Sequence, residues 1–148
     1  MDPKYTVKLD RTVGRWVYPL HRQLYERTGG RIGHRSMFGP ILLLTTTGRR
    51  SGQPRTTPLL YMADAESFWV VASNGGRPET PSWLHNLRAR PEATVQAGRD
   101  RVDVDAEILA GADRERIWSR LTEYYQGWSY YQQLTDRQLA AVHLTRRP

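Results

Sequence analysis

The chain has 148 residues, of which 39% are hydrophobic and 25% charged, and it contains no cysteine. This composition is typical of one soluble globular domain, and it excludes disulfides, thiolate metal sites and cysteine nucleophiles. The longest aliphatic run, residues 41–44, is far shorter than the roughly 20 residues that cross a bilayer, and residues 1–8 lack the apolar core of a signal peptide, so we expect a cytoplasmic protein.

The net charge of +7 comes almost entirely from arginine, because only Lys4 and Lys8 are lysines. A guanidinium matches phosphate and carboxylate oxygens with two parallel hydrogen bonds. The excess therefore suits an anionic partner: a nucleic acid, an acidic lipid surface or a small acidic ligand. A general preference for arginine codons explains the total equally well, but it does not explain where arginines cluster.

Residues 1–36 are predicted to form a basic helical segment that precedes a second unit, residues 37–148. Apolar side chains recur at helical spacing from Val13 to Tyr25 with arginines between them, Pro19 is expected to kink the helix, and Gly29 and Gly30 to end it. Such a helix packs on its own domain or lies on an anionic membrane surface, and we expect a peripheral membrane contact as one alternative.

From residue 40 onward the pattern predicts strands. Extended segments are expected at 40–47, 54–63, 67–73, 93–98, 101–109 and 141–146, with a turn at 64–66. Pro54 and Pro58 confine the second of these strands to a sheet edge or a bulge. Residues 101–109 alternate strictly between apolar and charged side chains, which indicates a half-buried strand.

Three helical pieces are predicted between these strands. Thr80 is expected to cap the first helix, with Pro81 at its first position, and Asp113 to cap the second. Gly127 is expected to end the second helix, and residues 128–137 to form a short aromatic helix. The fold class is therefore α+β, with an antiparallel sheet or small barrel, an N-terminal helix and inserted helices.

Common catalytic motifs do not occur. There is no Walker loop, no G-x-G-x-x-G after a strand and no G-x-S-x-G elbow. The four histidines are scattered without ligand spacing, and Asp103 and Asp105 belong to the charged face of their strand. We therefore expect no metal site, and in the absence of a recognition helix or stacking motif, no nucleic-acid partner.

The sequence TTTGRRSGQPRTT, residues 45–57, has more cations than a turn requires. If its flanking strands pair as a hairpin, Arg49, Arg50 and Arg55 converge at one end of the sheet, where Gly48 and Gly52 permit close approach of a ligand. The loop is either a cradle for phosphate or carboxylate groups or a basic hairpin exposed to solvent.

Four motifs in order resemble the deazaflavin-dependent nitroreductase family of actinobacteria. They are LLLTTTGRRSGQPRTTPLLY (42–61), VVASNGG (70–76), PSWLHNLRARPEATVQ (81–96) and YYQGWSYYQQLTDR (124–137). The resemblance implies a split β-barrel related to FMN-binding proteins and the coenzyme F-420, an 8-hydroxy-5-deazaflavin, with FMN less favoured.

The resemblance also implies a site. Arg50 and Arg55 would contact the acidic tail of the coenzyme, and Asn74 stands where the family has lysine. The implied coenzyme contacts are Arg49, Arg50, Ser51, Arg55, Thr56, Thr57, Pro58, Leu60, Ser73, Asn74, Gly75, Pro81, Ser82, Trp83 and Asn86.

The aromatic motif would form the acceptor side. Tyr125, Trp128 and Tyr131 would bind the substrate, with Trp128 replacing a tyrosine of the best-known members, and Tyr125, Tyr131 and Ser73 would serve catalysis. The implied reaction is hydride transfer from reduced F-420 to a planar electrophile such as a quinone or nitroaromatic, in a monomer or homodimer. Alternatives are an FMN- or haem-binding split barrel and a non-catalytic lipid-binding relative.

Overall fold

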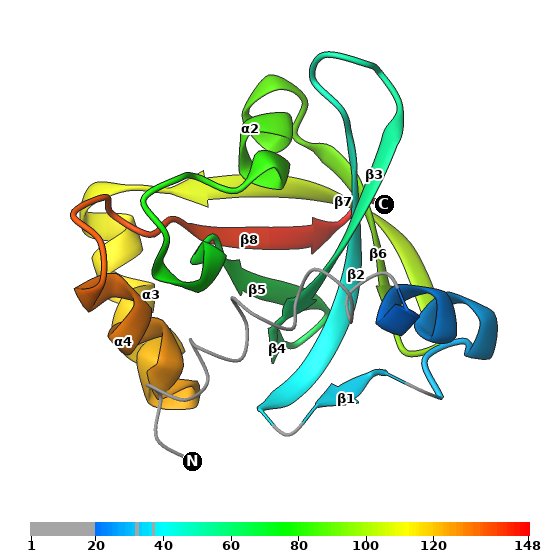
Figure 1. Ribbon diagram of the computed structural model, residues 1–148, viewed down its shortest axis with the longest axis horizontal. Coiled ribbons are helices and arrows are strands. Elements are labelled where there is room, and N and C mark those ends of the chain that lie inside the picture. The colour runs from blue at the N-terminus through cyan, green and yellow to red at the C-terminus, as the bar shows by residue number, and fades with distance from the viewer. Residues whose placement is uncertain (1–19, 32, 37) are drawn as a thin grey trace.

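A computed structural model of the chain describes residues 20–31, 33–36 and 38–148 (Figure 1). Eight antiparallel strands form one strongly curled sheet in the order β1-β2-β6-β7-β8-β5-β4, and β3 pairs with β2. The strands are β1 (Arg35–Ser36), β2 (Gly39–Thr47), β3 (Pro54–Leu60), β4 (Met62–Asp64), β5 (Ser67–Val71), β6 (Glu92–Ala97), β7 (Asp100–Leu109) and β8 (Ala141–Arg146).

The segment from residue 54 to residue 64 closes the sheet into a barrel. The predicted strand 54–63 divides at Tyr61 into β3, which pairs with β2, and β4, which pairs with β5. At the division the Tyr61 N–H donates to the carbonyl of Pro40, 3.2 Å away. β3 pairs with β2 alone, so the predicted edge position is confirmed, and the two prolines interrupt no second ladder.

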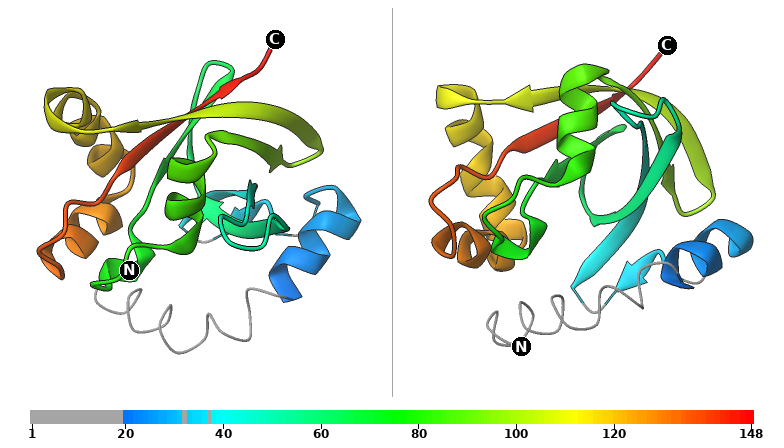
Figure 2. Two further views of the ribbon diagram at one scale, coloured as in Figure 1. Left: turned by 90° about the horizontal axis from the view of Figure 1, so that it is seen from above. Right: turned by 45° about the horizontal axis from the view of Figure 1, so that its top comes forward.

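Two apolar cores lie on opposite faces of β5. Phe68 and Val70 point into the barrel with the apolar side chains of β2, β6 and β7, whereas Trp69 and Val71 point outward. The outward face is covered by α3 (Gly111–Tyr124) and α4 (Gln126–Gln133), and α2 (Ser82–Ala89) packs over one end of the barrel, as Figure 2 shows. The predicted alternation in β7 is confirmed, with Val104 buried and Asp103 and Asp105 exposed.

The helix boundaries differ from the prediction in three places. The N-cap of α2 is Pro81 rather than Thr80, because Pro81 keeps an extended conformation (φ −64°, ψ 145°) while its carbonyl accepts from the Leu84 N–H. Asp113 lies inside the first turn of α3, where it pairs with Arg116; the N-cap is Ala110. The break before α4 falls at Tyr125, and Gly127 belongs to α4.

The N-terminal part of the described chain is tied to the barrel. Residues 20–28 are helical and end at Gly29 and Gly30, as predicted, with φ of 60° and 82°. The buried Tyr25 hydroxyl donates to the Gln96 carbonyl (3.0 Å) and accepts from the Gly98 N–H (2.6 Å). The predicted helical positions from Val13 to Pro19 lie outside the described residues.

Candidate functional site

The chain reverses tightly between β2 and β3, and residues 48–55, which include Arg49, Arg50 and Arg55, are here called the arginine hairpin. The Gly48 N–H donates to the Gln53 carbonyl, and the Gly52 N–H to the Gly48 carbonyl, both at 2.8 Å. Gly52 has φ of 71°, a conformation that glycine adopts without strain. The Ser51 hydroxyl accepts from Arg55 Nη2 at 3.4 Å, so the Arg55 side chain reaches back to the turn.

Asn86, on α2, anchors this hairpin from below. Its side chain is 3% exposed, and its Oδ1 accepts from the backbone N–H of Arg49 (3.1 Å) and from Arg49 Nη1 (3.4 Å). Its Nδ2 donates to the hydroxyl of the buried Thr46 at 3.1 Å. The side-chain amide, which the resemblance assigns to the coenzyme, is used to hold the hairpin in place.

The charges of the arginine hairpin are available to a ligand. Arg49, Arg50 and Arg55 are exposed, and none of them forms an ion pair with a carboxylate in the described part of the chain. Because these guanidiniums are hydrated and unneutralised, a phosphate or carboxylate ligand gains charge-assisted hydrogen bonds without breaking an internal pair. The arrangement fits a coenzyme that carries an acidic tail.

The register of β3 divides the predicted contacts between two faces. Arg55 and Thr57 are the cross-strand partners of Thr46 and Leu44, so they share the face that continues into the barrel end beneath α2. Thr56, Pro58 and Leu60 lie on the opposite face. A ligand that lies on one face of β3 therefore contacts the side chains of that face and only the backbone of the residues that point to the other face.

The first turn of α2 faces the same end of the barrel. Pro81 is buried, Ser82 is exposed, and Trp83 belongs to the barrel core with 6% of its surface exposed. Ser82 is therefore the accessible member of this group, and Trp83 mainly shapes the wall behind it.

Ser73, Asn74 and Gly75 lie in the loop of residues 72–77, which contains the short helix η1 (Asn74–Gly76). Asn74, Gly75 and Gly76 have φ of 46°, 62° and 75°, so this loop follows a path that side chains disfavour. The Asn74 side chain donates to the Glu79 carbonyl at 2.9 Å, which fixes the loop at its far end.

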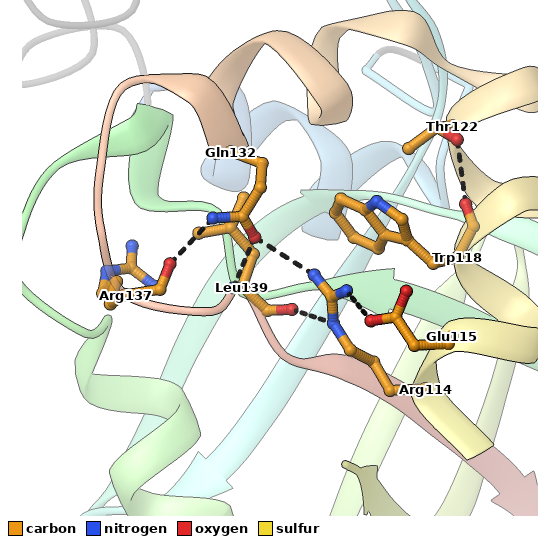
Figure 3. A network of polar contacts seen from close by, with 7 residues as sticks. All are labelled: Arg114, Glu115, Trp118, Thr122, Gln132, Arg137 and Leu139. Carbon is orange, nitrogen blue, oxygen red and sulfur yellow. Dashed lines mark hydrogen bonds and ion pairs between the residues drawn. The ribbon is translucent and has the colours of Figure 1, made fainter. Parts of the chain in front are cut away.

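Two arginines that the sequence analysis did not single out hold this corner of the molecule (Figure 3). Arg137 donates to the carbonyls of the 72–77 loop, and burial lowers the pKa of its guanidinium, an effect that the charge of Glu79 opposes. Arg114, 4% exposed, donates to the Leu139 carbonyl (3.0 Å) and lies over the Trp118 ring at 4.0 Å. The hydrogen bonds from these two arginines to backbone carbonyls join positions 25 to 65 residues apart, so local sequence carries no signal for them.

The three predicted acceptor residues meet at the start of α4. Trp128 is 3% exposed and Tyr131 6%, and both belong to the outer core, whereas Tyr125 is half-buried. The Tyr125 ring meets Trp128 edge-on (centroids 5.4 Å apart) and lies 6.5 Å from Tyr131. A Cβ at Gly127 would stand 2.2 Å from Tyr125 Cζ, so this glycine lets the ring fold back over the helix.

Phe38, which the sequence analysis missed, lies beside Tyr125 with its ring centroid 6.4 Å away. It precedes β2, far from α4 in sequence, and no motif marked it. The rings of Tyr125, Trp128 and Tyr131 are here called the aromatic wall, and Phe38 extends this wall toward the start of β2.

In the described part of the chain, no three His, Asp or Glu residues gather as metal ligands would, and no helix is both long and apolar enough to span a membrane.

Comparison with known proteins follows the same residues. A family model described as F420H(2)-dependent quinone reductase matches residues 17–146. An F420H(2)-dependent quinone reductase of Mycobacterium tuberculosis is 41% identical over 143 residues, covering 94% of this chain and 96% of the relative.

Two solved structures are also similar. One, described as an F420-H2 dependent reductase, is 39% identical with a TM-score of 0.65 and covers 71% of this chain and 93% of its own. Another, described as a domain-swapped dimer, is 34% identical with a TM-score of 0.68 and covers 90% of this chain and 99% of its own. The resemblance inferred from the four motifs is confirmed, and with it the split β-barrel and the class of F-420-dependent reductases.

Proposed function

The chain belongs to the F420H(2)-dependent quinone reductase family, and on this premise we propose that it transfers a hydride from reduced coenzyme F-420 to a quinone. The observation that carries the proposal is the arginine hairpin: exposed guanidiniums on a glycine turn, held from beneath by Asn86 and paired with no carboxylate of the described chain. That is a receptor for an acidic coenzyme.

Arg50 and Arg55 bind the phosphate and carboxylates of the coenzyme tail, and Ser51 adds a hydroxyl donor beside Arg55. Arg49 keeps the turn in register through Asn86 while its charge adds to the same potential. Ser82, at the exposed start of α2, completes this end of the site, and the remaining predicted contacts on β3 and α2 line its walls.

The coenzyme, when bound, supplies a hydride from C5 of its deazaflavin ring. The residues of this chain orient the two reactants, exclude water and deliver the proton that completes quinone reduction. Ser73 and Asn74 lie beside the ring, and Gly75 permits close approach of the backbone. We assign the proton to the hydroxyl of Tyr125 or Ser73, with Tyr131 as the supporting phenol.

The aromatic wall favours a flat, apolar acceptor. Trp128 and Tyr131 are buried and hold the Tyr125 ring edge-on, so the half-buried Tyr125 presents the surface that an acceptor ring contacts. Trp128 stands where the best-known nitroreductases have tyrosine, so we place nitroaromatics as a secondary class of substrate.

The N-terminal segment, residues 1–36, acts in this proposal as an appendage of the barrel. Its described helix exposes Leu20 (60%) and Leu24. Arg27 and Arg31 are exposed, and Arg22 is half-buried. Apolar and basic side chains in one segment suit an anionic membrane surface, where quinones dissolve. Co-sedimentation with anionic and neutral lipid vesicles tests this contact. Binding to neither kind would contradict it.

We also propose that the protein forms a homodimer, and the relative described as a domain-swapped dimer supports this. Light scattering during size-exclusion chromatography measures the mass directly. A mass of one 17.1 kDa chain at all concentrations would contradict the dimer.

The deciding experiment is a titration of the purified protein with F-420 and with FMN, followed by optical assay of reduced F-420 oxidation. We expect affinity for F-420 above FMN, and oxidation that depends on an added quinone and is slower with a nitroaromatic. Binding of FMN alone, of haem alone, or of no cofactor would overturn the proposal.

A further inference from the structure

We propose that Arg137 is a positioning residue for this reaction: it fixes the 72–77 loop so that Ser73 stays aligned between coenzyme and acceptor. The inference rests on the proposed function, because it assigns the loop to the reaction site. It adds a residue that touches neither reactant.

The guanidinium of Arg137 spans the whole loop. Its Nη1 donates to the Ala72 carbonyl at 3.0 Å, its Nη2 to the Ser73 carbonyl at 2.8 Å, and its Nε to the Arg77 carbonyl at 3.0 Å. One planar group thus fixes the first two residues and the last residue of the loop. A lysine could not, because a single ammonium cannot meet three carbonyls with this geometry.

The loop needs such a clamp because its backbone path is unfavourable. Asn74 has φ of 46°, a conformation that is unfavourable for a residue other than glycine, and the loop contains the bonds from the Gly76 N–H to the Ser73 carbonyl and from the Arg77 N–H to the Asn74 carbonyl. Gly76 also packs closely on the end of α4: a Cβ there would lie 2.9 Å from the Leu134 side chain and the Tyr131 carbonyl.

The clamp is itself held by Gln132, in the last turn of α4. Gln132 Nε2 donates to the Arg137 carbonyl at 2.8 Å, and Gln132 Oε1 accepts from the Leu139 N–H (2.8 Å) and from Arg114 Nη2 (3.1 Å), as Figure 3 shows. The neighbouring residue is Tyr131. The loop with Ser73 and the helix with the aromatic wall are therefore connected through Arg137 as one unit, which sets the distance between the two sides of the site.

The charge of Arg137 is also retained. Burial lowers the pKa of Arg137 and the charge of Glu79 raises it, yet no carboxylate of the described chain forms an ion pair with Arg137. A positive charge directly behind the Ser73 carbonyl favours the negative charge that develops on a quinone oxygen during reduction. Geometry and charge act together, and the variants below separate them.

The test compares Arg137→Gln and Arg137→Lys with a control, Arg146→Gln. Arg146 also donates to a backbone carbonyl, that of Glu66 (2.8 Å), but it belongs to β8 and also pairs with Asp100. For Arg137→Gln we expect kcat to fall about 30-fold, because misalignment of the loop costs orientation. The dissociation constant of F-420 should change by less than about 3-fold, since the arginine hairpin holds the charged tail.

A second measurement does not depend on catalysis. Hydrogen–deuterium exchange of the ligand-free proteins should show faster exchange of the 72–77 amides in Arg137→Gln, by about 10-fold, with residues 48–53 unchanged. Arg137→Lys keeps the charge without the three hydrogen bonds, so its loop should exchange as fast as in Arg137→Gln and its kcat should recover only in part. Full turnover in Arg137→Lys with a fast-exchanging loop would overturn the positioning role.

The two proposals fail in different ways. Wild-type protein that neither binds nor oxidises reduced F-420 refutes the function. An active wild type whose Arg137→Gln variant keeps both kcat and loop exchange, or matches Arg146→Gln in every respect, refutes the inference. If Arg137→Gln does not fold, Arg137→Lys takes its place, and 72–77 amides that exchange there as slowly as in the wild type would refute the inference.

Discussion

The arginine hairpin and the corner held by Arg114 and Arg137 use the same side chain in opposite ways. At the hairpin, Arg50 and Arg55 are exposed and pair with no carboxylate of the described chain. At the corner, Arg114 donates to the Leu139 carbonyl and to Gln132, and Arg137 donates to the carbonyls of the 72–77 loop. A guanidinium whose donors are already used stabilises the fold, whereas one whose donors remain hydrated can bind an anion.

The net charge of the chain does not distinguish these roles. Each arginine adds one unit to the total, but removing it should have consequences that differ by region: loss of stability at the corner and loss of ligand affinity at the hairpin. The comparison is therefore open to direct test.

The largest effect is expected at Arg114. Arg114→Leu leaves the Leu139 carbonyl and the Gln132 side chain short of a buried partner, so the free energy of unfolding should fall by about 3 kcal/mol in urea denaturation. The matched control is Arg116→Ala, an exposed arginine of the same helix, with a change within about 0.5 kcal/mol. Equal losses in the two variants would break the comparison.

The double variant Arg50→Ala, Arg55→Ala tests the opposite region. We expect F-420 affinity to fall about 100-fold and to depend less on salt, because charge-assisted hydrogen bonds to the tail are lost. The unfolding free energy should stay within about 0.5 kcal/mol of wild type. Isothermal titration at two salt concentrations measures this, with Arg88→Ala, Arg90→Ala as the control for general charge; an equal loss in that control would remove the special role of the hairpin.

Tyr25 adds a third case to the comparison, because it is an uncharged buried residue whose hydroxyl forms hydrogen bonds within the protein. Tyr25→Phe should lower the unfolding free energy by about 1–2 kcal/mol at pH 7 and leave F-420 affinity unchanged.

The same variant carries a pH signature. Burial raises the pKa of Tyr25 to about 12 from an ordinary value of 10, so the contribution of the neutral phenol is complete below pH 10 and is lost as the pH rises toward 12. The stability difference between wild type and Tyr25→Phe should therefore shrink between pH 10 and 12, as chemical denaturation at a series of pH values would show. A difference that stays constant would contradict this account.

The smallest effect is expected for Asn86→Asp, which gives the hairpin an internal carboxylate. Its oxygen would still accept from Arg49, but it would neutralise one cation and lose the donor to Thr46. F-420 affinity should fall about 5-fold. Arg49→Ala is the companion variant: if neutralisation is the cause, Asn86→Asp should weaken binding much less in that background.

Local chemistry explains which features could be read from the sequence. Gly48, Gly52 and the β-branched run before them specify the hairpin, and the alternation of residues 101–109 specifies its strand, because both depend on neighbours in sequence. The family motifs then supplied the coenzyme. The clamp at Arg137 could not be read, since its acceptors are 60 to 65 residues away.

The helix boundaries differ from the prediction because side-chain packing, rather than local propensity, decides where these helices begin and end. Gly127 was predicted to end a helix because glycine favours that role, yet here it makes room for the Tyr125 ring, and the chain bends at Tyr125 instead. Trp128 and Tyr131 belong with Tyr125 to one sequence motif, but only the packing of α3, α4 and β5 reveals that two of the three are buried.

The position of β8 has a consequence for how the protein is made. β8 lies between β7 and β5 and forms a hydrogen-bond ladder with each of them. It nevertheless follows the other described strands in the order of synthesis. While the ribosome is still elongating the chain, the edges of β5 and β7 that pair with β8 have no partner strand. Cooperative folding is thus deferred until residues 141–146 have left the exit tunnel, and a nascent chain arrested before that point should be a client for chaperones.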